Sequence, residues 1–403
     1  MWDVIIIGGG AAGMMAGITA SSHGYHTLIL DRMDRIGKKV LATGNGRCNL
    51  MNMTPLDYLG SQELAHSVLE RVSPSSLYAF FRQMGLSMRT EPDGRVYPSS
   101  GKAATVLDLF RLHLRMNGVT VHVSEPVVQF RKVGDHFCVD TEKDHYTCRY
   151  VIVCCGGMAQ PALGSNGSGY ALLVALGHHV TPCFPCLTPL KTDLTKIRGL
   201  EGIRVRGSVR IMKGERTLHR EEGEILFTSY GVSGICIMQC AQWAEKGTEL
   251  ELDFLSGLSM NNLEFMDLIR HRMDSWGDEN CEQLFSGLFV RSLAAAILKD
   301  AGIPGDRPMK SLTERDIHHL HMAAGAFRIP VTGRKGFDMA QITGGGVEGS
   351  EFDPETLESR IIPGLYAAGE ILDVHGMCGG YNLMFAFASG MLAGLCGHGG
   401  QAL

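Results

Sequence analysis

The sequence has little of several features that mark specialised classes of protein. It contains only 3 Trp and 10 Tyr in 403 residues, so aromatic platforms for stacking splayed nucleic-acid bases are scarce. Its 37 Lys and Arg are nearly balanced by 42 Asp and Glu, giving a net charge of −5, which disfavours a general binder of nucleic acid or acidic membrane. The longest apolar stretch, residues 383–396, is interrupted by Ser and Gly and is shorter than the roughly 20 residues of a membrane span. We therefore expect no membrane-spanning segment.

The sequence also lacks the marks of secretion and of a metal site. The chain starts MWDVIIIGGG, with neither a basic region nor a small-residue cleavage site, so the apolar start is expected to be a strand rather than a signal. Twelve Cys without a signal indicate reduced thiols. His318, His319 and His321 have helical spacing, but no Cys or carboxylate pattern completes a ligand set. We expect a cytoplasmic protein with no bound metal.

Glycine, in contrast, is abundant, and its first cluster has the order strand, turn, helix. The 51 Gly are nearly twice the roughly 7% of average usage. A β-branched run at residues 4–7 leads into Gly8-x-Gly10-x-x-Gly13 and a small-residue helix, and the next apolar run ends at Asp31. This is the spacing of a dinucleotide-binding βαβ unit, with a pyrophosphate at the helix N-terminus and the acid on a ribose hydroxyl. A plain tight turn is the weaker alternative.

Two Gly-rich segments near the C-terminus predict which dinucleotide is bound. Residues 364–370, GLYAAGE, form an apolar strand that ends in Gly and an acid, and residues 376–382, GMCGGYN, open the last helix. The first arrangement suits a ribityl chain. The second puts a helix N-terminus where it can stabilise negative charge on a reduced flavin. We therefore predict FAD rather than NAD, with two loops that merely make the fold compact as the alternative.

The two ends of the chain share the strand-then-Gly pattern, whereas the middle loses it. Residues 117–149 alternate as a predicted meander, and a buried strand at 150–153 runs into Gly156-Gly157. We predict an α/β fold in which both chain termini build one Rossmann-like FAD-binding domain around an insert. The predicted boundaries are 1–188 and 331–403 for the FAD-binding domain and 189–330 for the inserted substrate domain, β-rich over 189–257 and helical over 258–330.

Segments spread along the whole chain together resemble a known family. They are IGKK and TGNGRCN within residues 36–49, GRVYPS at 94–99, GSNGSGY at 164–170, TGGGV at 343–347 and GEILD at 369–373. In these segments the chain is similar to the bacterial BaiN/RdsA (YhiN) family of FAD-binding flavoproteins, also known as aminoacetone-oxidase-type enzymes. The resemblance implies an FAD domain built from both termini with an inserted β-barrel-like plus helical domain. It also implies that GRCN and the last Gly-rich turn border the isoalloxazine ring.

The motifs and the resemblance together give a set of predicted cofactor-binding residues in or beside the Gly-rich turns. They are Gly8, Gly10, Ala11, Ala12, Gly13, Asp31, Arg32, Lys39, Gly44, Gly46, Arg47, Cys48, Asn49, Val127, Gly156, Gly157, Gly369, Glu370, Gly379, Gly380, Tyr381, Asn382 and Leu383. The predicted catalytic residues are Cys48, Arg47 and His375.

Two groups of cysteines each leave two interpretations open. Arg47 could lower the pKa of the neighbouring Cys48 and make it a proton donor or thiolate, or Cys48 is a structural residue of a Gly-rich turn. Cys183-x-x-Cys186 has the spacing of a redox pair. It lies in a Pro-rich link rather than at a helix start, which favours incidental packing cysteines.

One stretch runs against the overall charge balance. Its basic residues are Lys191, Lys196, Arg198, Arg204, Arg206, Arg210, Lys213, Arg216 and Arg220, against only Asp193, Glu201 and Glu215. Such a stretch could hold RNA phosphates. Ordinary strand faces neutralised by nearby acids are the favoured alternative.

The resemblance implies two activities with one chemistry: reduction of a C=C bond in 3-oxo bile acid intermediates, and reduction of uridine to dihydrouridine in ribosomal RNA. We predict an FAD-dependent oxidoreductase that reduces a C=C bond conjugated to a carbonyl. No second GxGxxG domain is present, so NAD(P)H is expected only as a transient reductant. A small-molecule substrate is favoured and ribosomal RNA is the alternative. A non-catalytic FAD protein stays open, because Ser229 and Ile235 replace a His and a Pro of the family motif. An amine oxidase stays open because the family is also known as aminoacetone-oxidase-type enzymes.

Overall fold

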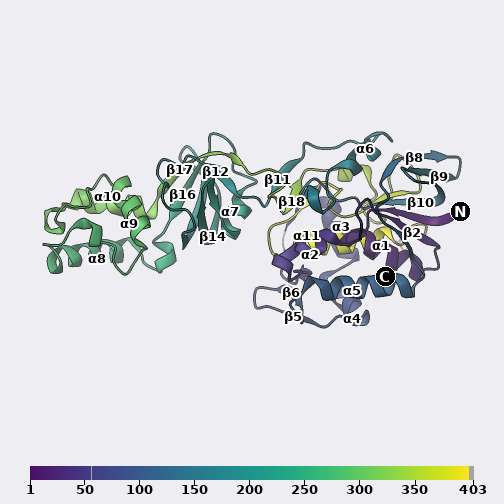
Figure 1. The fold of residues 1–403 in the computed structure, drawn as a ribbon, viewed down its shortest axis with the longest axis horizontal. Coiled ribbons are helices and arrows are strands. Elements are labelled where there is room, and N and C mark those ends of the chain that lie inside the picture. The colour runs from purple at the N-terminus through teal and green to yellow at the C-terminus, as the bar shows by residue number, and fades with distance from the viewer. Residues whose placement is uncertain (56, 399–403) are drawn as a thin grey trace. The chain divides into compact units, whose positions relative to one another are not determined.

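The apolar runs at the two ends of the chain meet in one sheet. In the computed structural model, which describes residues 1–55 and 57–398, the chain forms two units (Figure 1). Unit 1 is Met1–Pro185 with Gln341–Leu403, and unit 2 is Cys186–Ala340. The predicted α/β class, with a Rossmann-like domain built from both termini around a barrel-and-helix insert, is confirmed.

Unit 1 is organised around a seven-stranded sheet of order β7-β2-β1-β10-β9-β8, with β19 also paired to β10. The strands are β1 (Trp2–Ile7), β2 (Thr27–Leu30), β7 (Thr120–His122), β8 (Val127–Val133), β9 (His136–Thr141), β10 (His145–Val153) and β19 (Leu365–Ala367). The central pairings are parallel, whereas β8, β9 and β10 form an antiparallel meander. Buried parallel strands are expected to be continuously apolar, as β1 and β2 are.

The expected meander over residues 117–149 is wrong in its first strand. β7 pairs in parallel with β2 instead of joining the antiparallel strands that follow it. The physical reason is the preceding helix α5 (Ala103–Met116), which carries the chain over the sheet so that the next strand enters in the parallel sense.

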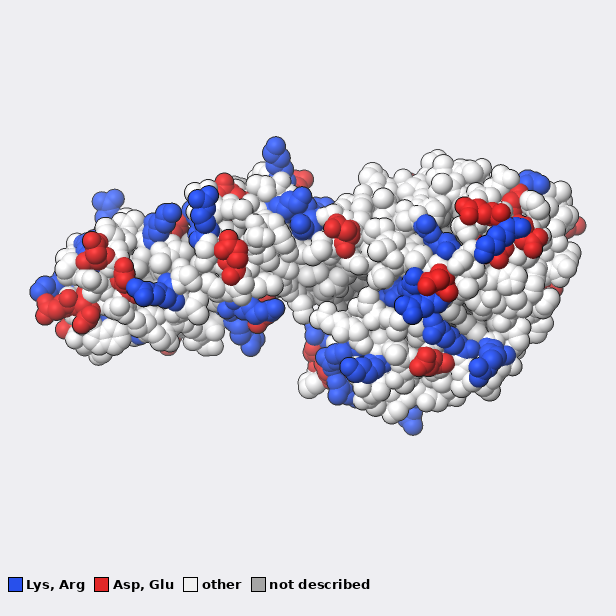
Figure 2. Space-filling view, viewed as in Figure 1, with Lys and Arg blue, Asp and Glu red and all other residues white. Residues whose placement is uncertain are grey.

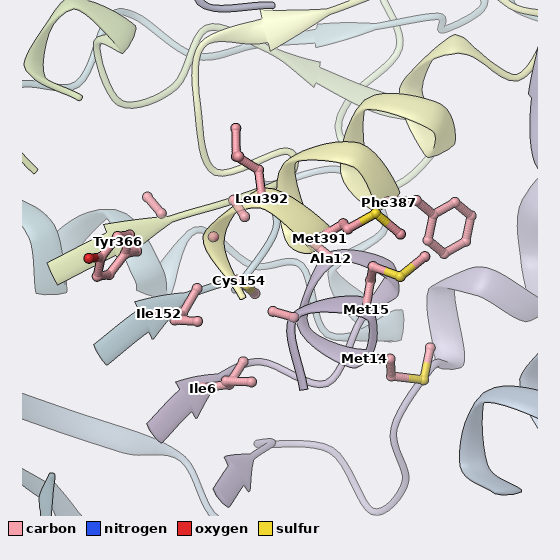
Figure 3. Packing of buried hydrophobic residues seen from close by; sticks show 14 of the residues in the cluster. Ile6, Ala12, Met14, Met15, Ile152, Cys154, Tyr366, Phe387, Met391 and Leu392 are labelled. Atoms are coloured by element: carbon pink, nitrogen blue, oxygen red, sulfur yellow. The ribbon is translucent and has the colours of Figure 1, made fainter. Parts of the chain in front are cut away.

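Helices cover this sheet and form the core behind the first Gly turn. Besides α5 they are α1 (Ala11–Ser22), α2 (Lys38–Ala42), α3 (Gln62–Arg71), α4 (Pro74–Gln83), α6 (Ser168–Val174) and α11 (Tyr381–Ala393). Figure 3 shows α1 and α11 packed together over strands β1, β10 and β19. Gly390 permits this contact, because a Cβ there would lie 2.3 Å from the carbonyl oxygen of Ala12.

Short elements complete unit 1 around the sheet. The strands are β3 (Met51–Asn52), β4 (Leu59–Gly60), β5 (Met88–Thr90), β6 (Arg95–Pro98), β11 (Phe184–Cys186), β18 (Ile342–Gly344) and β20 (Val374–His375). Single 3-10 turns are η1 (Thr43–Gly46), η2 (Pro161–Leu163) and η6 (Gly349–Glu351). The order β3-β6-β5 makes one small sheet, and β4 pairs with β20.

Unit 2 is a closed barrel of order β12-β15-β14-β13-β16-β17 with a helical excursion. The strands are β12 (Leu190–Thr192), β13 (Arg204–Lys213), β14 (Arg216–Thr228), β15 (Gly231–Ser233), β16 (Glu249–Asp253) and β17 (Phe327–Arg334). The helices are α7 (Ile235–Cys240), α8 (Asn262–Ser275), α9 (Arg291–Asp300) and α10 (Glu314–Gly325), with 3-10 turns η3 (Ser256–Leu258), η4 (Cys281–Gln283) and η5 (Met309–Ser311).

The internal division of the insert differs from the one predicted at residue 257. Strand β17 follows the helices and pairs with both β16 and β12, so the barrel closes only after the helical excursion. Unit 2 also runs on to Ala340, because β17 continues to Arg334. Among the described residues, no helix is long and apolar enough to cross a membrane.

Candidate functional site

The Gly turn between β1 and α1 combines close backbone contacts with one open position. A Cβ on Gly13 would lie 1.8 Å from the carbonyl oxygen of Gly8, and Gly8 itself has φ +105°. Both residues therefore need to be glycine for the turn to form. Gly10 differs, because its φ is −78° and a Cβ there would meet no atom within 4 Å. The space in front of Gly10 belongs to a cavity of unit 1.

Helix α1 begins at this cavity with uncompensated amide groups. Its N-cap is Gly10, no side chain caps it, and its first turn holds no acid. The first helical bond runs from the amide of Met14 to Gly10, so the amides before Met14 have no acceptor within the helix. Ala11 and Ala12 line the cavity. Free amides and the helix dipole make this helix end suited to a phosphate group.

Asp31 links the end of β2 to the same turn. Its Oδ2 accepts from the amide of Gly9 and its Oδ1 accepts from the amide of Met33, both at 2.7 Å. Burial raises the pKa of Asp31 above its usual value and outweighs these two bonds. A carboxylate has about four lone-pair sites, so Asp31, which lines the cavity, retains acceptor capacity for a ligand hydroxyl.

About half of the predicted cofactor-binding residues line this cavity. They are Gly8, Gly10, Ala11, Ala12, Asp31, Arg32, Lys39, Val127, Gly156, Gly369, Glu370, Asn382 and Leu383. The remaining predicted residues are not part of its wall: Gly13, Gly44, Gly46, Arg47, Cys48, Asn49, Gly157, Gly379, Gly380, Tyr381 and, among the catalytic set, His375.

Sequence reasoning missed several polar groups of the cavity wall. Arg35, Thr43, Glu125 and Gln341 all line it. Glu125 precedes the predicted Val127 by two residues, and Thr43 opens the TGNGRCN segment, so proximity to a predicted residue could have found these two. Gln341 follows the insert directly in sequence, and no pattern in its neighbours points to the cavity.

An ion pair joins the two chain segments across the cavity wall. Lys39 Nζ lies 2.6 Å from Glu370 Oε2, and both side chains are about one fifth exposed. Glu370 Oε1 accepts from the amide of Thr343 at 2.9 Å. The hydroxyl of Thr343 in turn accepts from the amides of Met158 and Ala159. The Glu370 end of the pair is therefore held by backbone amides of two further segments, directly by Thr343 and through its hydroxyl by Met158 and Ala159, and both members of the pair face the cavity.

A second helix N-terminus borders the cavity from the C-terminal side. Helix α11 has Gly380 at its N-cap, with φ +102° and no side-chain cap. The Asn382 side chain shapes the preceding loop, since its Oδ1 accepts from the amide of Gly376 and its Nδ2 donates to the carbonyl of Gly376. Asn382 therefore reaches the cavity while its amide group holds the Gly-rich loop. The free amides of α11 favour negative charge beside them.

Of the two interpretations of Cys48, a thiol with a lowered pKa is not supported by the structure. The Cys48 side chain has no exposed surface, and this burial raises its pKa to about 12, with a bond from Thr43 acting weakly the other way. Arg47 does not offset the burial, because its guanidinium lies over the Tyr97 ring and bonds to Glu91. Burial therefore favours the neutral thiol over the thiolate.

His375 is buried behind the cavity wall and is also neutral. Only 6% of the residue is exposed, and burial lowers its pKa, with Asp373 acting weakly in the opposite sense. Its Nδ1 lies 3.9 Å from Asp373 Oδ1, and neither atom has a hydrogen-bond partner among the described residues. His375 therefore lacks the charged form that would make it an acid at pH 7. Cys183 is a free thiol, so the Cys183-x-x-Cys186 spacing does not correspond to a disulfide in this structure.

Five of the nine residues of the basic stretch in unit 2 form ion pairs with acids, whereas Lys191, Arg198, Arg206 and Arg216 form none with the described residues. Arg210 Nη2 lies 2.7 Å from Glu251, Lys213 Nζ 3.1 Å from Glu245 and Arg220 Nη2 2.7 Å from Glu222. Arg204 pairs with Glu224 and Lys196 with Asp300. Strand register explains two of these pairs, Arg210–Glu251 and Arg204–Glu224, since β13 lies between β14 and β16. Figure 2 shows acidic and basic side chains interspersed on unit 2.

Comparisons with known proteins bear on both units. The family model described as HI0933-like protein Rossmann domain matches residues 2–396. A 3-dehydro-bile acid delta(4,6)-reductase of Clostridium scindens is 35% identical over 400 residues, which cover 96% of this chain and 97% of the relative. A ribosomal RNA dihydrouridine synthase of Escherichia coli is 27% identical, covering 96% of each chain.

One solved structure shares the fold at low identity. The structure of 3-ketosteroid-delta4-(5alpha)-dehydrogenase from Rhodococcus jostii matches with a TM-score of 0.50 and 16% identity, covering 98% of this chain and 96% of that one.

Proposed function

This chain belongs to the HI0933-like family, as its motifs predicted, and from that premise we propose that it is an FAD-dependent oxidoreductase that reduces a C=C bond conjugated to a carbonyl group. One observation carries the proposal. The cavity of unit 1 joins two uncapped helix N-termini, an open Gly10 and the acceptor Asp31 in a single wall.

The residues of the cavity fit FAD along its length. The amides of α1 and the space before Gly10 suit the pyrophosphate, and Asp31 suits a ribose hydroxyl. Val127 contributes to the wall near Asp31 and suits the adenine side. When bound, FAD supplies the hydride that reduction of a conjugated alkene requires. The N-terminus of α11 stabilises negative charge at the redox ring, and the Lys39–Glu370 pair holds the two chain segments around it.

Reduction of the alkene also needs a proton on the carbon next to the one that takes the hydride. Cys48 and His375 were the sequence-derived donors, but both are buried and neither lines the cavity. Burial raises the pKa of Cys48 to about 12, which makes its thiol a weak acid, and lowers the pKa of His375, which disfavours the protonated imidazole. We therefore assign the proton to solvent at the open side of the cavity, and Cys48 and Asn49 to the support of the Gly-rich turns. Arg47, which is partly exposed, is kept as a substrate-binding group.

A small-molecule substrate of the 3-oxo steroid type is favoured. The relative at 35% identity is named for a bile acid, and five of the nine basic residues of the stretch in unit 2 are already paired with acids. Ribosomal RNA is the second candidate, because two relatives named ribosomal RNA dihydrouridine synthase, at 27% and 25% identity, match over 96% of this chain. NAD(P)H is the proposed reductant and binds transiently.

The test follows the two half-reactions of the purified protein without oxygen. We expect bound FAD to be bleached by NADPH or NADH and its colour to return on adding a 3-oxo-4-ene steroid. Cys48→Ala should leave the rate of this second step within about threefold, because a proton donor would cost about 10²-fold or more. Protein that takes up no FAD contradicts the proposal. Reoxidation by oxygen and not by the alkenone would favour an oxidase, and loss of one ribosomal dihydrouridine in a deletion strain would favour RNA.

A further inference from the structure

Arg47 is held on two sides by the hairpin β5–β6, next to the 3-10 turn η1. Its guanidinium carbon lies 4.2 Å from the centre of the Tyr97 ring, and its Nη2 donates to Glu91 Oε1 at 3.0 Å. Tyr97 is only 6% exposed, so the ring that carries the guanidinium is fixed by packing. The Arg47 side chain itself is 42% exposed. An arginine oriented in this way keeps part of its planar fork open to solvent.

The residues that hold Arg47 connect directly to the cavity wall. Thr43, the first residue of η1, lines the cavity, and its carbonyl accepts from the amide of Cys48, while Arg47 donates its own amide to Gly44. A Cβ on Gly44 would lie 3.7 Å from the Tyr97 ring. The 3-10 turn η1 therefore packs against the Tyr97 ring and also contributes Thr43 to the cavity wall. Arg47 follows η1, and its side chain is partly exposed to solvent.

The charges around Arg47 do not balance. The cluster contains three arginines, Arg47, Arg89 and Arg95, and two acids, Glu91 and Asp93. Glu91 is shared between Arg47 and Arg89, whose Nη2 lies 3.7 Å away, and Asp93 pairs with Arg95 at 3.3 Å. Within residues 1–55 and 57–398, no other acid forms an ion pair with these arginines. One positive charge is left over, and Figure 2 shows basic side chains gathered over this hairpin.

We propose that Arg47 docks a carboxylate group of the substrate, with Tyr97 and Glu91 as its positioning residues. A carboxylate supplies the missing negative charge and matches the guanidinium fork, which a neutral carbonyl does not. The proposal rests on the proposed function, and it narrows the substrate to a small alkenone that also carries an acid group. Tyr97 fixes the plane of the guanidinium, and Glu91 fixes its rotation within that plane.

The test compares a substrate-like acid with its neutral ester. Binding of 3-oxo-4-cholenoic acid and of its methyl ester to the holoprotein is measured by titration calorimetry, which does not depend on turnover. We expect the wild type to bind the acid about tenfold or more tightly than the ester, since a charge-assisted bond of about 1.5 kcal/mol has that effect. The preference should shrink as salt is raised, because the site is partly exposed. Arg47→Met should remove the preference and leave binding of the ester unchanged.

Matched variants separate docking from a general charge effect. Arg89→Met removes one positive charge from the same hairpin but no guanidinium from the Tyr97 ring, so it should reduce the preference for the acid by less than about threefold. Tyr97→Phe keeps the ring and should retain the preference, whereas Tyr97→Leu should lose most of it. Glu91→Gln keeps an acceptor for Arg47 but removes a competing charge, so binding of the acid should tighten by about two- to fivefold.

The outcomes distinguish this proposal from the proposed function. A wild type that binds acid and ester equally, or an Arg47→Met variant that loses both equally, overturns the docking site even if the alkenone is reduced. Equal effects of Arg89→Met and Arg47→Met also overturn it, as does an RNA oligonucleotide that loses affinity in Arg47→Met while the acid does not. A wild type that prefers the acid without reducing it supports the docking site and contradicts the proposed function.

Discussion

The cavity of unit 1 and the β13–β14 face of unit 2 both attract attention in the sequence, one through glycines and the other through basic residues. In the cavity, the groups that a ligand needs remain available: the amides of α1 have no cap, and Gly10 leaves open space. On the barrel face, Arg204, Arg210 and Arg220 are each bonded to an acid. A residue type indicates a binding site only where the fold leaves its hydrogen-bonding groups or its charge without a partner.

The largest effect is expected where the cavity has its open position. Gly10→Val should abolish FAD binding, with a loss of about 100-fold or more, because a branched side chain fills the space that a pyrophosphate needs. The φ of −78° suits any residue, so the apoprotein should fold normally. Flavin content after purification measures FAD binding, and thermal unfolding of the apoprotein measures its stability. The FAD affinity of Gly10→Ala should lie between those of the wild type and Gly10→Val. A variant that keeps its FAD would contradict the assignment of this cavity.

The ion pair of the cavity wall should give the next largest effect. Lys39→Met leaves the partly buried carboxylate of Glu370 facing the cavity without its cation, and we expect FAD affinity to fall by about tenfold. Adding Glu370→Gln to Lys39→Met removes the unpaired carboxylate, so this double variant should recover part of the lost FAD affinity. Fluorescence titration of the apoprotein with FAD measures the affinity of both single variants and of the double variant. Additive losses in the double variant would show that the two residues do not act as a pair.

The parts of the site that could be predicted are those built from neighbouring residues. The turn Gly8–Gly13 and Asp31 lie within one βαβ unit of about 30 residues. The pattern at Gly369 is also a strand followed directly by Gly, so it too is made of neighbouring residues. Arg47 was identified as a candidate, but Glu91 and Tyr97, which hold it, come from a hairpin more than 40 residues further along the chain. Their contribution depends on tertiary packing, which no local pattern encodes.

The same limit explains the errors in the predicted fold and charge. β7 was assigned to a meander from its alternation, although the order of strands in the sheet is decided by the crossover helix α5. One of the two interpretations of Cys48 was a lowered pKa, because Arg47 is adjacent in sequence. Adjacent residues of a turn point in different directions, and burial decided the shift. Neutralised strand faces were the favoured interpretation of the basic stretch, but the partner of Arg210, Glu251, lies outside the stretch and meets it through strand register.

A smaller effect is expected from pH, and it concerns Asp31 in the cavity. Burial raises the pKa of this carboxyl group despite the bonds from Met33 and Gly9. Asp31 therefore takes up a proton at a higher pH than an exposed Asp, and a ribose hydroxyl then loses a charged acceptor. We expect FAD affinity to fall by less than about tenfold as the pH is lowered from 7 to about 4, near the usual pKa of an Asp. The same titration with Asp31→Asn should give a flat profile, and a flat profile in the wild type would contradict the role of Asp31.

The smallest effect separates structural from functional arginines on the barrel. Arg210→Ala should lower the free energy of unfolding by about 1 kcal/mol, because Glu251, whose side chain is only 5% exposed, then keeps one of its two arginines. Arg216→Ala removes an exposed charge of the same strand pair, and we expect no measurable change in stability. Denaturant unfolding measures both variants. Affinity for a uridine-containing RNA should be the same in both as in the wild type, since the Arg210 charge is already taken up by an acid of the barrel. A steep, salt-dependent loss of RNA affinity in Arg210→Ala would instead assign the barrel face to RNA and leave the cavity as only half of the site.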